Sequence, residues 1–68
     1  MLIQLNGEPL EVAENIFLPE LVASLKLKPE QVAVEVNQLV VRRRYWELTQ
    51  LHTGDKIEIV HFVGGGGQ

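Results

Sequence analysis

The residues of this sequence with the clearest chemical use are four consecutive glycines, Gly64 to Gly67, which we call the glycine run and which precede Gln68. Glycine has no Cβ, so such a run can pass through an enzyme channel too narrow for other residues. A carboxylate at its end is unhindered and, with a pKa of about 3.3–3.7, is ionised at neutral pH. It can attack the α-phosphorus of a nucleotide to form an acyl-adenylate, from which a sulfur or amine nucleophile displaces the nucleotide.

The glycine run also has a simpler interpretation, as a disordered end without a function. Ordering a residue costs about 1–2 kcal/mol of backbone entropy, and glycine has no side chain to bury in compensation. We therefore expect a folded domain over residues 1–63 and a flexible tail over residues 64–68, mobile in the free protein from about Gly64 onward.

Side chains that carry out catalysis are scarce in this sequence. Ser24 is the only serine, His52 and His61 are the only histidines, and there is no cysteine. This set contains no evident nucleophile with its base and no familiar spacing of metal ligands. We expect no catalytic residue, no metal site and no stably bound cofactor, so that any chemistry on the tail is carried out by other enzymes.

The composition indicates one small domain. The chain has 68 residues, of which 46% are hydrophobic, enough for a modest core. Its first residues do not resemble a signal peptide, and no run of about 18 apolar residues is present to cross a membrane. The absence of cysteine is typical of a cytoplasmic protein. The net charge of −3 argues against nucleic acid as a partner.

Hydrophobic patterns predict the elements that must position the tail. Asn6-Gly7 predicts a hairpin turn between strands over residues 1–5 and 8–12, because both residues tolerate positive φ. Pro9 lacks an N–H group and therefore places the second of these strands at an edge of the sheet.

A helix and three more strands are predicted after this hairpin. The helix begins near Pro19 and is stopped by Pro29, and its apolar stripe consists of Leu18, Leu21, Val22 and Leu25. The strands cover residues 32–36, 39–41 and 56–63. This order indicates an α+β domain with one helix on one face of a mixed sheet and with the first and last strands as parallel neighbours in the middle. The sheet residues expected beneath the helix are Ile3, Leu5, Val34, Val36, Ile57 and Ile59.

The last strand suggests a surface for partners. Ile57 and Ile59 share one face, so Val60 and Phe62 point to the other. If the isoleucines face the helix, the other pair lies on the open face of the sheet, where apolar side chains suggest a partner site. The alternative is that the loop carrying Trp46 covers them.

That loop contains the only run of charges. Arg42 to Arg44 are either a solvated loop or a docking patch for an acidic partner surface. Trp46 is predicted to be an anchor in the core or at its edge.

The order of several motifs is similar to that of the ThiS family, the sulfur carriers of thiamine thiazole biosynthesis. These motifs are LNGEPLEV, PELVASL, KPEQVAVEVN, VVRRRYW and GDKIEIVHFVGG, and together they cover essentially the whole chain. The resemblance implies a ubiquitin-like β-grasp fold. It also implies that a ubiquitin-activating-type adenylyltransferase uses ATP to adenylate the C-terminal glycine. A cysteine desulfurase system then supplies sulfur for a thiocarboxylate, which a thiazole synthase consumes.

The same resemblance assigns roles within the tail. The family ends in Gly-Gly, which corresponds to a modified glycine at Gly66, or at Gly67 for a longer glycine ending. Gln68 departs from this pattern, so either it is trimmed before activation or this end works differently. Arg42 stands where the family commonly has proline. The residues expected to dock on the partner enzymes are Val60, Phe62, Arg43, Gly64 and Gly65.

Three other interpretations stay open. The small subunit of molybdopterin synthase shares the fold, the Gly-Gly tail and the thiocarboxylate, although its chains tend to be longer. A protein-conjugating ubiquitin-like modifier uses the same kind of tail for isopeptide bonds. A β-grasp binding module, such as those appended to synthetases and GTPases, has no role for a terminal carboxylate and no reason to end in glycines.

Overall fold

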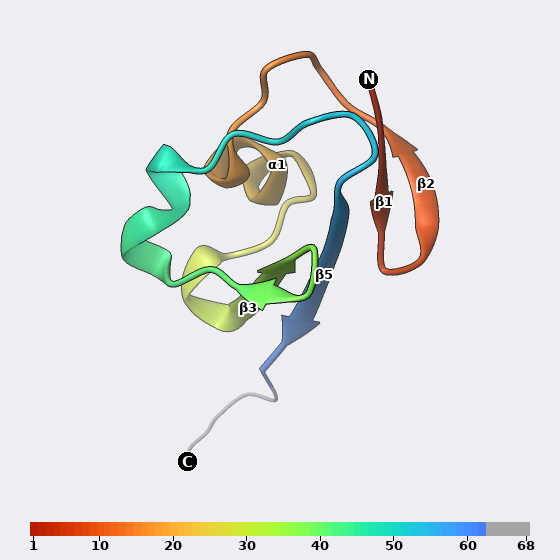
Figure 1. The fold of residues 1–68 in the computed structure, drawn as a ribbon. Coiled ribbons are helices and arrows are strands. Elements are labelled where there is room, and N and C mark those ends of the chain that lie inside the picture. Colours follow the sequence, from red (N-terminus) through yellow and green to blue (C-terminus); the bar gives the residue numbers. More distant parts are fainter. Residues whose placement is uncertain (63–68) are drawn as a thin grey trace.

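The computed structural model describes residues 1–62, and in them it places five strands and one α-helix (Figure 1). The strands are β1 (Leu2–Leu5), β2 (Glu8–Glu11), β3 (Val32–Val36), β4 (Leu39–Val40) and β5 (Lys56–His61). Helix α1 spans Leu18–Ser24. Two 3-10 helices, η1 (Pro29–Gln31) and η2 (Arg43–Leu48), lie in the connections.

The strands form one mixed sheet in the order β2-β1-β5-β3-β4. β1 and β5 are parallel neighbours, and the other pairs are antiparallel. Helix α1 lies against one face of this sheet (Figure 1). The predicted α+β architecture and the central position of the first and last strands are therefore confirmed. The expected domain boundary after residue 63 and the expected tail over 64–68 lie outside the described residues.

Two hairpin turns connect the antiparallel pairs. Asn6 and Gly7 have φ angles of 50° and 85°, and Asn37 and Gln38 have 53° and 72°. Positive φ at both central positions is what a two-residue type I′ turn requires, and asparagine and glycine adopt it readily. Both turns are where the sequence predicts them. Pro9 lies on β2, an edge strand, as its missing N–H group requires.

Helix α1 begins with Pro19 in its first turn, as predicted. Its first turn is closed by Glu20, whose carboxylate accepts a hydrogen bond of 2.8 Å from the backbone N–H of Phe17. An acidic side chain here also interacts favourably with the positive end of the helix. The helix is seven residues long, and in the part of the chain that is described no helix is long and apolar enough to cross a membrane.

The end of α1 differs from the prediction. Pro29 does not stop the helix, which has already ended at Ser24. Lys26 adopts a φ of 61°, its N–H donates to the carbonyl of Ala23, and the N–H of Leu27 donates to the carbonyl of Val22. This pair of bonds is a Schellman motif, which satisfies the last carbonyls of a helix and is usually made with glycine at the left-handed position. A lysine there gave no local signal in the sequence.

The core lies between α1 and the sheet. Its buried side chains are Ile3, Leu18, Leu21, Val22, Val32, Val34, Trp46, Leu51 and Ile57. Four residues predicted in the core are only partly buried, namely Leu5, Leu25, Val36 and Ile59. The core also contains Trp46 and Leu51 from the long connection before β5, where Trp46 donates its indole N–H to the carbonyl of Val41 at 2.9 Å. The prediction of Trp46 as a core anchor is confirmed.

Candidate functional site

The end of β5 is the structure from which the glycine run departs. The last described residue, Phe62, donates its backbone N–H to the carbonyl of Gln31 in η1 at 2.8 Å. The chain is therefore held by η1 immediately before it leaves the sheet. The candidate site residues Gly64, Gly65, Gly66 and Gly67 lie outside the described residues.

An asparagine side chain holds β5 on its other side. β1 pairs with β5 only as far as Leu5 and Ile57, and the next backbone bond runs from the N–H of Asn6 to the carbonyl of Ile57 at 2.8 Å. Beyond it, the carboxamide Oδ1 of Asn6 accepts the N–H of Ile59 at 2.9 Å. This side chain extends the parallel ladder by one rung after the strand β1 has turned away. It thereby fixes the part of β5 that leads into the tail.

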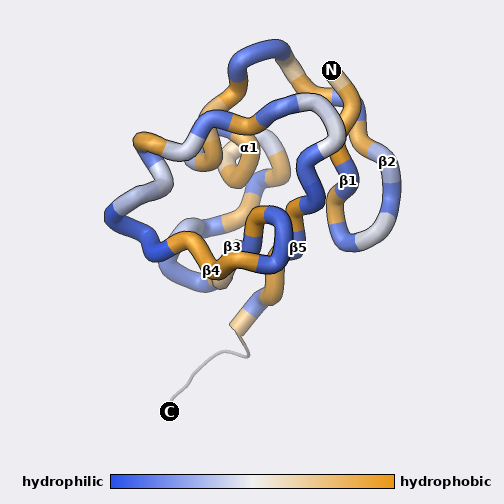
Figure 2. Tube along the Cα trace, in the orientation of Figure 1, coloured by the Kyte–Doolittle hydropathy of each residue, from blue (hydrophilic) through white to orange (hydrophobic). Residues whose placement is uncertain are grey.

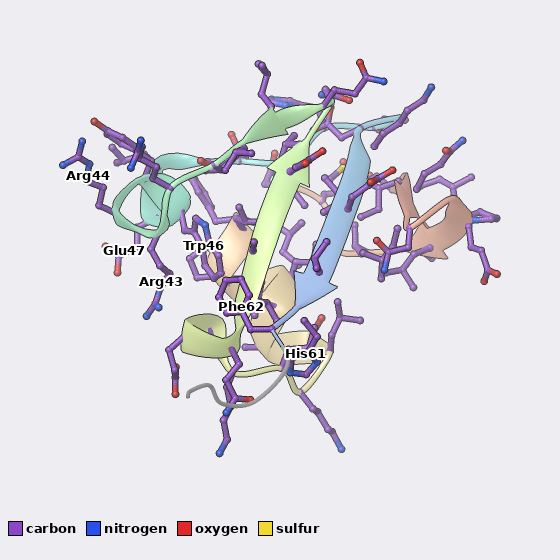
Figure 3. All side chains as sticks on the ribbon, turned by 90° about the horizontal axis from the view of Figure 1, so that it is seen from below. Arg43, Arg44, Trp46, Glu47, His61 and Phe62 are labelled. Carbon is purple, nitrogen blue, oxygen red and sulfur yellow. The ribbon has the colours of Figure 1, made fainter. Side chains whose placement is uncertain are left out.

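The open face of the sheet carries the predicted apolar pair. Ile57 is buried beneath α1, so the alternation along β5 turns Val60 and Phe62 to the opposite face, where their side chains are 60% and 56% exposed. Figure 3 looks onto this face with α1 behind the strands, and Phe62 lies on it uncovered. The loop that carries Trp46 does not cover the pair. The predicted exposure is confirmed, whereas the docking role stays a prediction.

Two carboxylates share this open face. Glu35 of β3 lies directly opposite Glu58 of β5, and Ala33 lies opposite Val60. Like charges at directly opposite positions of an antiparallel pair destabilise the sheet. Among the described residues, no basic group forms a salt bridge with either glutamate. The open face is therefore both apolar and acidic, and the pairing of Glu35 with Glu58 depends on a strand register that the sequence pattern does not indicate.

The arginines form a different surface, on η2. Arg43 lies with its guanidinium 5.3 Å from the centre of the Trp46 ring, and Arg44 lies 5.0 Å from the ring of Tyr45. Figure 3 shows Arg43, Arg44 and Glu47 projecting away from the sheet, while Trp46 lies between η2 and the strands. Figure 2 shows this stretch as strongly hydrophilic next to the hydrophobic β4.

A groove of about 560 Å³ runs along these side chains, and we call it the arginine groove. It is lined by Pro19, Pro29, Arg43, Arg44, Trp46 and Glu47. Neither Val60 nor Phe62 lines it. The structure therefore brings the predicted apolar pair together on one face and places Arg43 in a neighbouring groove.

The serine and His52 are engaged in local structure. The hydroxyl of Ser24 donates to the carbonyl of Leu21 at 2.7 Å. Asp55 accepts the backbone N–H of His52 at 2.7 Å, and the His52 ring lies 3.8 Å from the same carboxylate oxygen. Within residues 1–62 no group of three or more metal-ligating side chains is assembled. These contacts stabilise turns and a helix end, and they form no set of residues for catalysis.

Comparison with known proteins identifies related chains. The model of the ThiS family matches residues 3–66. The sulfur carrier protein ThiS of Bacillus subtilis is 36% identical over 66 residues, which cover 96% of this chain and all of that protein. A thiazole synthase of Magnetococcus marinus is 46% identical over 66 residues, which cover 97% of this chain, but the chain spans only 20% of that protein's length.

A solved structure shows the same arrangement of elements. The crystal structure of thiamine biosynthesis protein ThiS from Geobacter metallireducens superimposes with a TM-score of 0.85 at 38% identity, covering 97% of this chain and all of that one. The mixed sheet with one main helix, together with this likeness, confirms the expected ubiquitin-like β-grasp fold.

Proposed function

Because this chain belongs to the ThiS family, we propose that it is a sulfur carrier of thiamine biosynthesis, acted on by other enzymes rather than catalytic itself. The observation that carries the proposal is the family match over residues 3–66, which includes the first glycines after β5. The carboxylate of Gly66 or Gly67 becomes a thiocarboxylate, and its sulfur is donated for formation of the thiazole ring.

The proposed reactions take place at the glycine carboxylate and not at a side chain. The carboxylate oxygen attacks the α-phosphorus of ATP on an adenylyltransferase, and pyrophosphate leaves. The terminal sulfur of a persulfide from a cysteine desulfurase system then attacks the acyl carbon, and AMP leaves. A thiol reductant cleaves the resulting acyl disulfide, which releases the thiocarboxylate. ATP is thus used by the partner enzyme, and the carrier holds no cofactor. The absence of cysteine from this chain is consistent with a sulfur atom that travels on the terminal carbon.

The folded part of the chain limits how far this carboxylate can lie from the domain. Asn6 and Gln31 hold β5 and Phe62 from two sides, at 2.9 Å and 2.8 Å. Gly66 is four positions after Phe62 in the sequence, and an extended chain of four residues spans at most about 14 Å. When a partner binds the domain near Phe62, the reacting carbon therefore lies no farther than this distance from the bound surface.

Two partners are proposed to grip this end of the molecule in turn, the adenylyltransferase and the thiazole synthase. The relative named thiazole synthase, in which a similar segment makes up 20% of the length, supports the second. The docking residues are Val60 and Phe62 on the open face, Arg43 beside it, and Gly64 and Gly65 in the enzyme channel. Exposed aromatic side chains of this kind often carry much of the binding energy of an interface. A cytoplasmic location, as expected from the sequence, belongs to the same proposal.

The experiment is the intact mass of chains that end at Gly66 or at Gly67 after incubation with the adenylyltransferase of the host, ATP and a sulfur donor. We expect an oxygen-to-sulfur exchange at the terminal carboxylate, which depends on ATP. Transfer of the product to the thiazole synthase and to the large subunit of molybdopterin synthase then distinguishes the two pathways. A mass that stays unchanged with every activating enzyme contradicts the carrier role and favours a binding module.

A further inference from the structure

We propose that the arginine groove is a docking site for an acidic segment of the thiazole synthase, and that Arg43 and Arg44 recognise its carboxylates. This inference rests on the proposed function and deepens it, because it assigns to one partner a surface separate from the open face of the sheet. The groove offers apolar walls from Pro19, Pro29 and Trp46 and two guanidinium groups above them. Such a lining fits a short peptide segment that combines acidic and apolar side chains.

The positive charge of this chain is concentrated around the groove, which Arg43 and Arg44 line and which Arg42 precedes in the sequence. Arg42 to Arg44 are three of its six basic residues, so the rest of the chain has three basic residues against nine acidic ones. A positive patch on a negative body orients the molecule as it approaches an acidic surface. An acidic segment of a partner is attracted to η2 and repelled by the part of the open face where Glu35 and Glu58 lie opposite each other.

The guanidinium groups are held in place without being neutralised. Within residues 1–62 no carboxylate lies within salt-bridge distance of an arginine side chain, and no arginine side chain forms a hydrogen bond. Arg43 and Arg44 instead lie over the rings of Trp46 and Tyr45. Stacking leaves the planar fork of N–H donors available, and this fork matches a carboxylate in geometry.

The carboxylate of Glu47 restricts which anions can bind in the arginine groove. It lines the same groove, and its negative charge opposes a multiply charged anion more than a single carboxylate. A free phosphate or nucleotide is therefore a poorer match than the side chains of a protein segment.

The groove also lies next to the exit of the tail. Pro29, which lines it, is the first residue of η1, and Gln31 at the other end of η1 accepts the N–H of Phe62. A segment seated in the groove is therefore close to the point from which the glycine run departs. The synthase is the partner to which we assign the groove, because it must hold the sulfur-bearing end of the chain, and because the relative of that name contains a similar segment.

The test measures the Kd of the full-length carrier for the purified thiazole synthase by calorimetry at two ionic strengths. Arg44→Gln and the double variant Arg43→Gln/Arg44→Gln are compared with Lys56→Gln, which removes one positive charge at the far end of β5. We expect the double variant to raise the Kd about tenfold at ~0.05 M salt. We expect Lys56→Gln to change it less than about twofold. The difference should shrink at ~0.5 M salt, because the Debye length falls.

The Arg44→Gln variant controls for misfolding, because Arg44 lies over the ring of Tyr45 and does not stack on the buried Trp46. Arg44→Gln should melt at the wild-type temperature and still weaken binding several-fold. Equal effects of Arg44→Gln and Lys56→Gln would overturn the proposal, as would wild-type affinity of the double variant or no binding of the wild type to the synthase. A loss confined to the adenylyltransferase would overturn the choice of partner. Sulfur loading of the chains that end at Gly66 or Gly67, followed separately by mass, reports on the proposed function alone.

Discussion

Asn6 and Ile59 are 53 positions apart in the sequence, and the side-chain oxygen of the first accepts the backbone N–H of the second at 2.9 Å. Asn6 has a positive φ and so serves the type I′ turn, while its side chain continues the ladder between β1 and β5. Asn37 also has a positive φ, in the turn between β3 and β4. Its Oδ1 accepts the N–H of Lys56, the first residue of β5, at 3.0 Å. The two hairpin turns therefore hold both ends of the central strand.

Replacing Asn6 by glycine separates these two roles, because glycine also adopts positive φ. We expect Asn6→Gly to lower the free energy of unfolding by roughly 0.5–2 kcal/mol, from the lost hydrogen bond and the more flexible unfolded chain. Urea unfolding measures the change, and amide exchange at Ile59 should accelerate. Asn6→Asp, which keeps the acceptor, should remain close to wild type. Equal losses in both variants would show that the side-chain bond contributes nothing.

Leu21 is completely buried, at 0% exposure, on the face of α1 that packs on the sheet. Leu21→Ala should cost about 2–5 kcal/mol, because it removes apolar contact and leaves a cavity. In a domain of 68 residues this is a large part of the total stability, and it is measured by chemical denaturation. The matched control is Leu39→Ala on a side chain that is 72% exposed, which should change stability by at most about 0.5 kcal/mol.

Phe62→Ala tests the open face as a docking surface. We expect it to weaken adenylation, seen as a higher KM for the carrier in pyrophosphate release, and to change the free energy of unfolding by less than about 1 kcal/mol. Leu48→Ala is the control, since Leu48 is 78% exposed on η2 and does not line the open face. If Phe62→Ala mainly lowers the melting temperature, the residue belongs to the core and the patch is misplaced.

The position of the activated glycine is tested by chains that end at Gly65, Gly66, Gly67 and Gln68. Each residue shifts the terminal carboxylate by up to about 3.3–3.6 Å, and reactive geometry tolerates errors of only about 1 Å. We expect the chain that ends at Gly66 or Gly67 to release pyrophosphate and gain sulfur, and the chain that ends at Gly65 to react poorly. A chain that ends at Gln68 should be inactive, because a branched side chain then adjoins the carboxylate. Equal sulfur loading on Gln68 would refute the role assigned to the glycines.

The ammonium group of Met1 predicts a pH dependence. It donates to the carbonyl of Val12 at 2.6 Å and lies 3.0 Å from Glu11 and 3.5 Å from Glu14. The hydrogen bond to Glu11 raises the pKa of this ammonium above its ordinary value of 8.0, although desolvation opposes the rise. Its contribution to stability is thus complete below pH 8 and is lost as pH rises through the raised pKa.

The measurement is the urea midpoint between pH 7 and pH 10. Wild type should lose stability over this range, and Glu11→Gln should lose less, because its ammonium group has the weaker partner. A midpoint that falls equally in both proteins would contradict the assignment.

Local patterns in the sequence predict much of this fold, because they reflect requirements of one or two residues. Asn6-Gly7 predicts its turn, since few residues adopt positive φ. The alternation of Ile57 and Val60 predicts which side of β5 is buried, since side chains of a strand alternate between faces. The chemical use of the glycine run likewise follows from the absence of a Cβ in each of its residues.

The tertiary structure alone decides how distant parts meet. Leu51 in the connection before β5 is fully buried, whereas Ile59 is only partly buried against the core, and Arg43 lines a groove together with Pro19. Helix α1 ends at Ser24 and is followed by a left-handed Lys26, well before the proline that the sequence suggests as its stop. The first two outcomes depend on packing between segments that lie far apart in the chain. The free energy of such contacts exceeds the small local preferences of single residues. Patterns along the sequence reflect only these local preferences, so they do not predict the contacts.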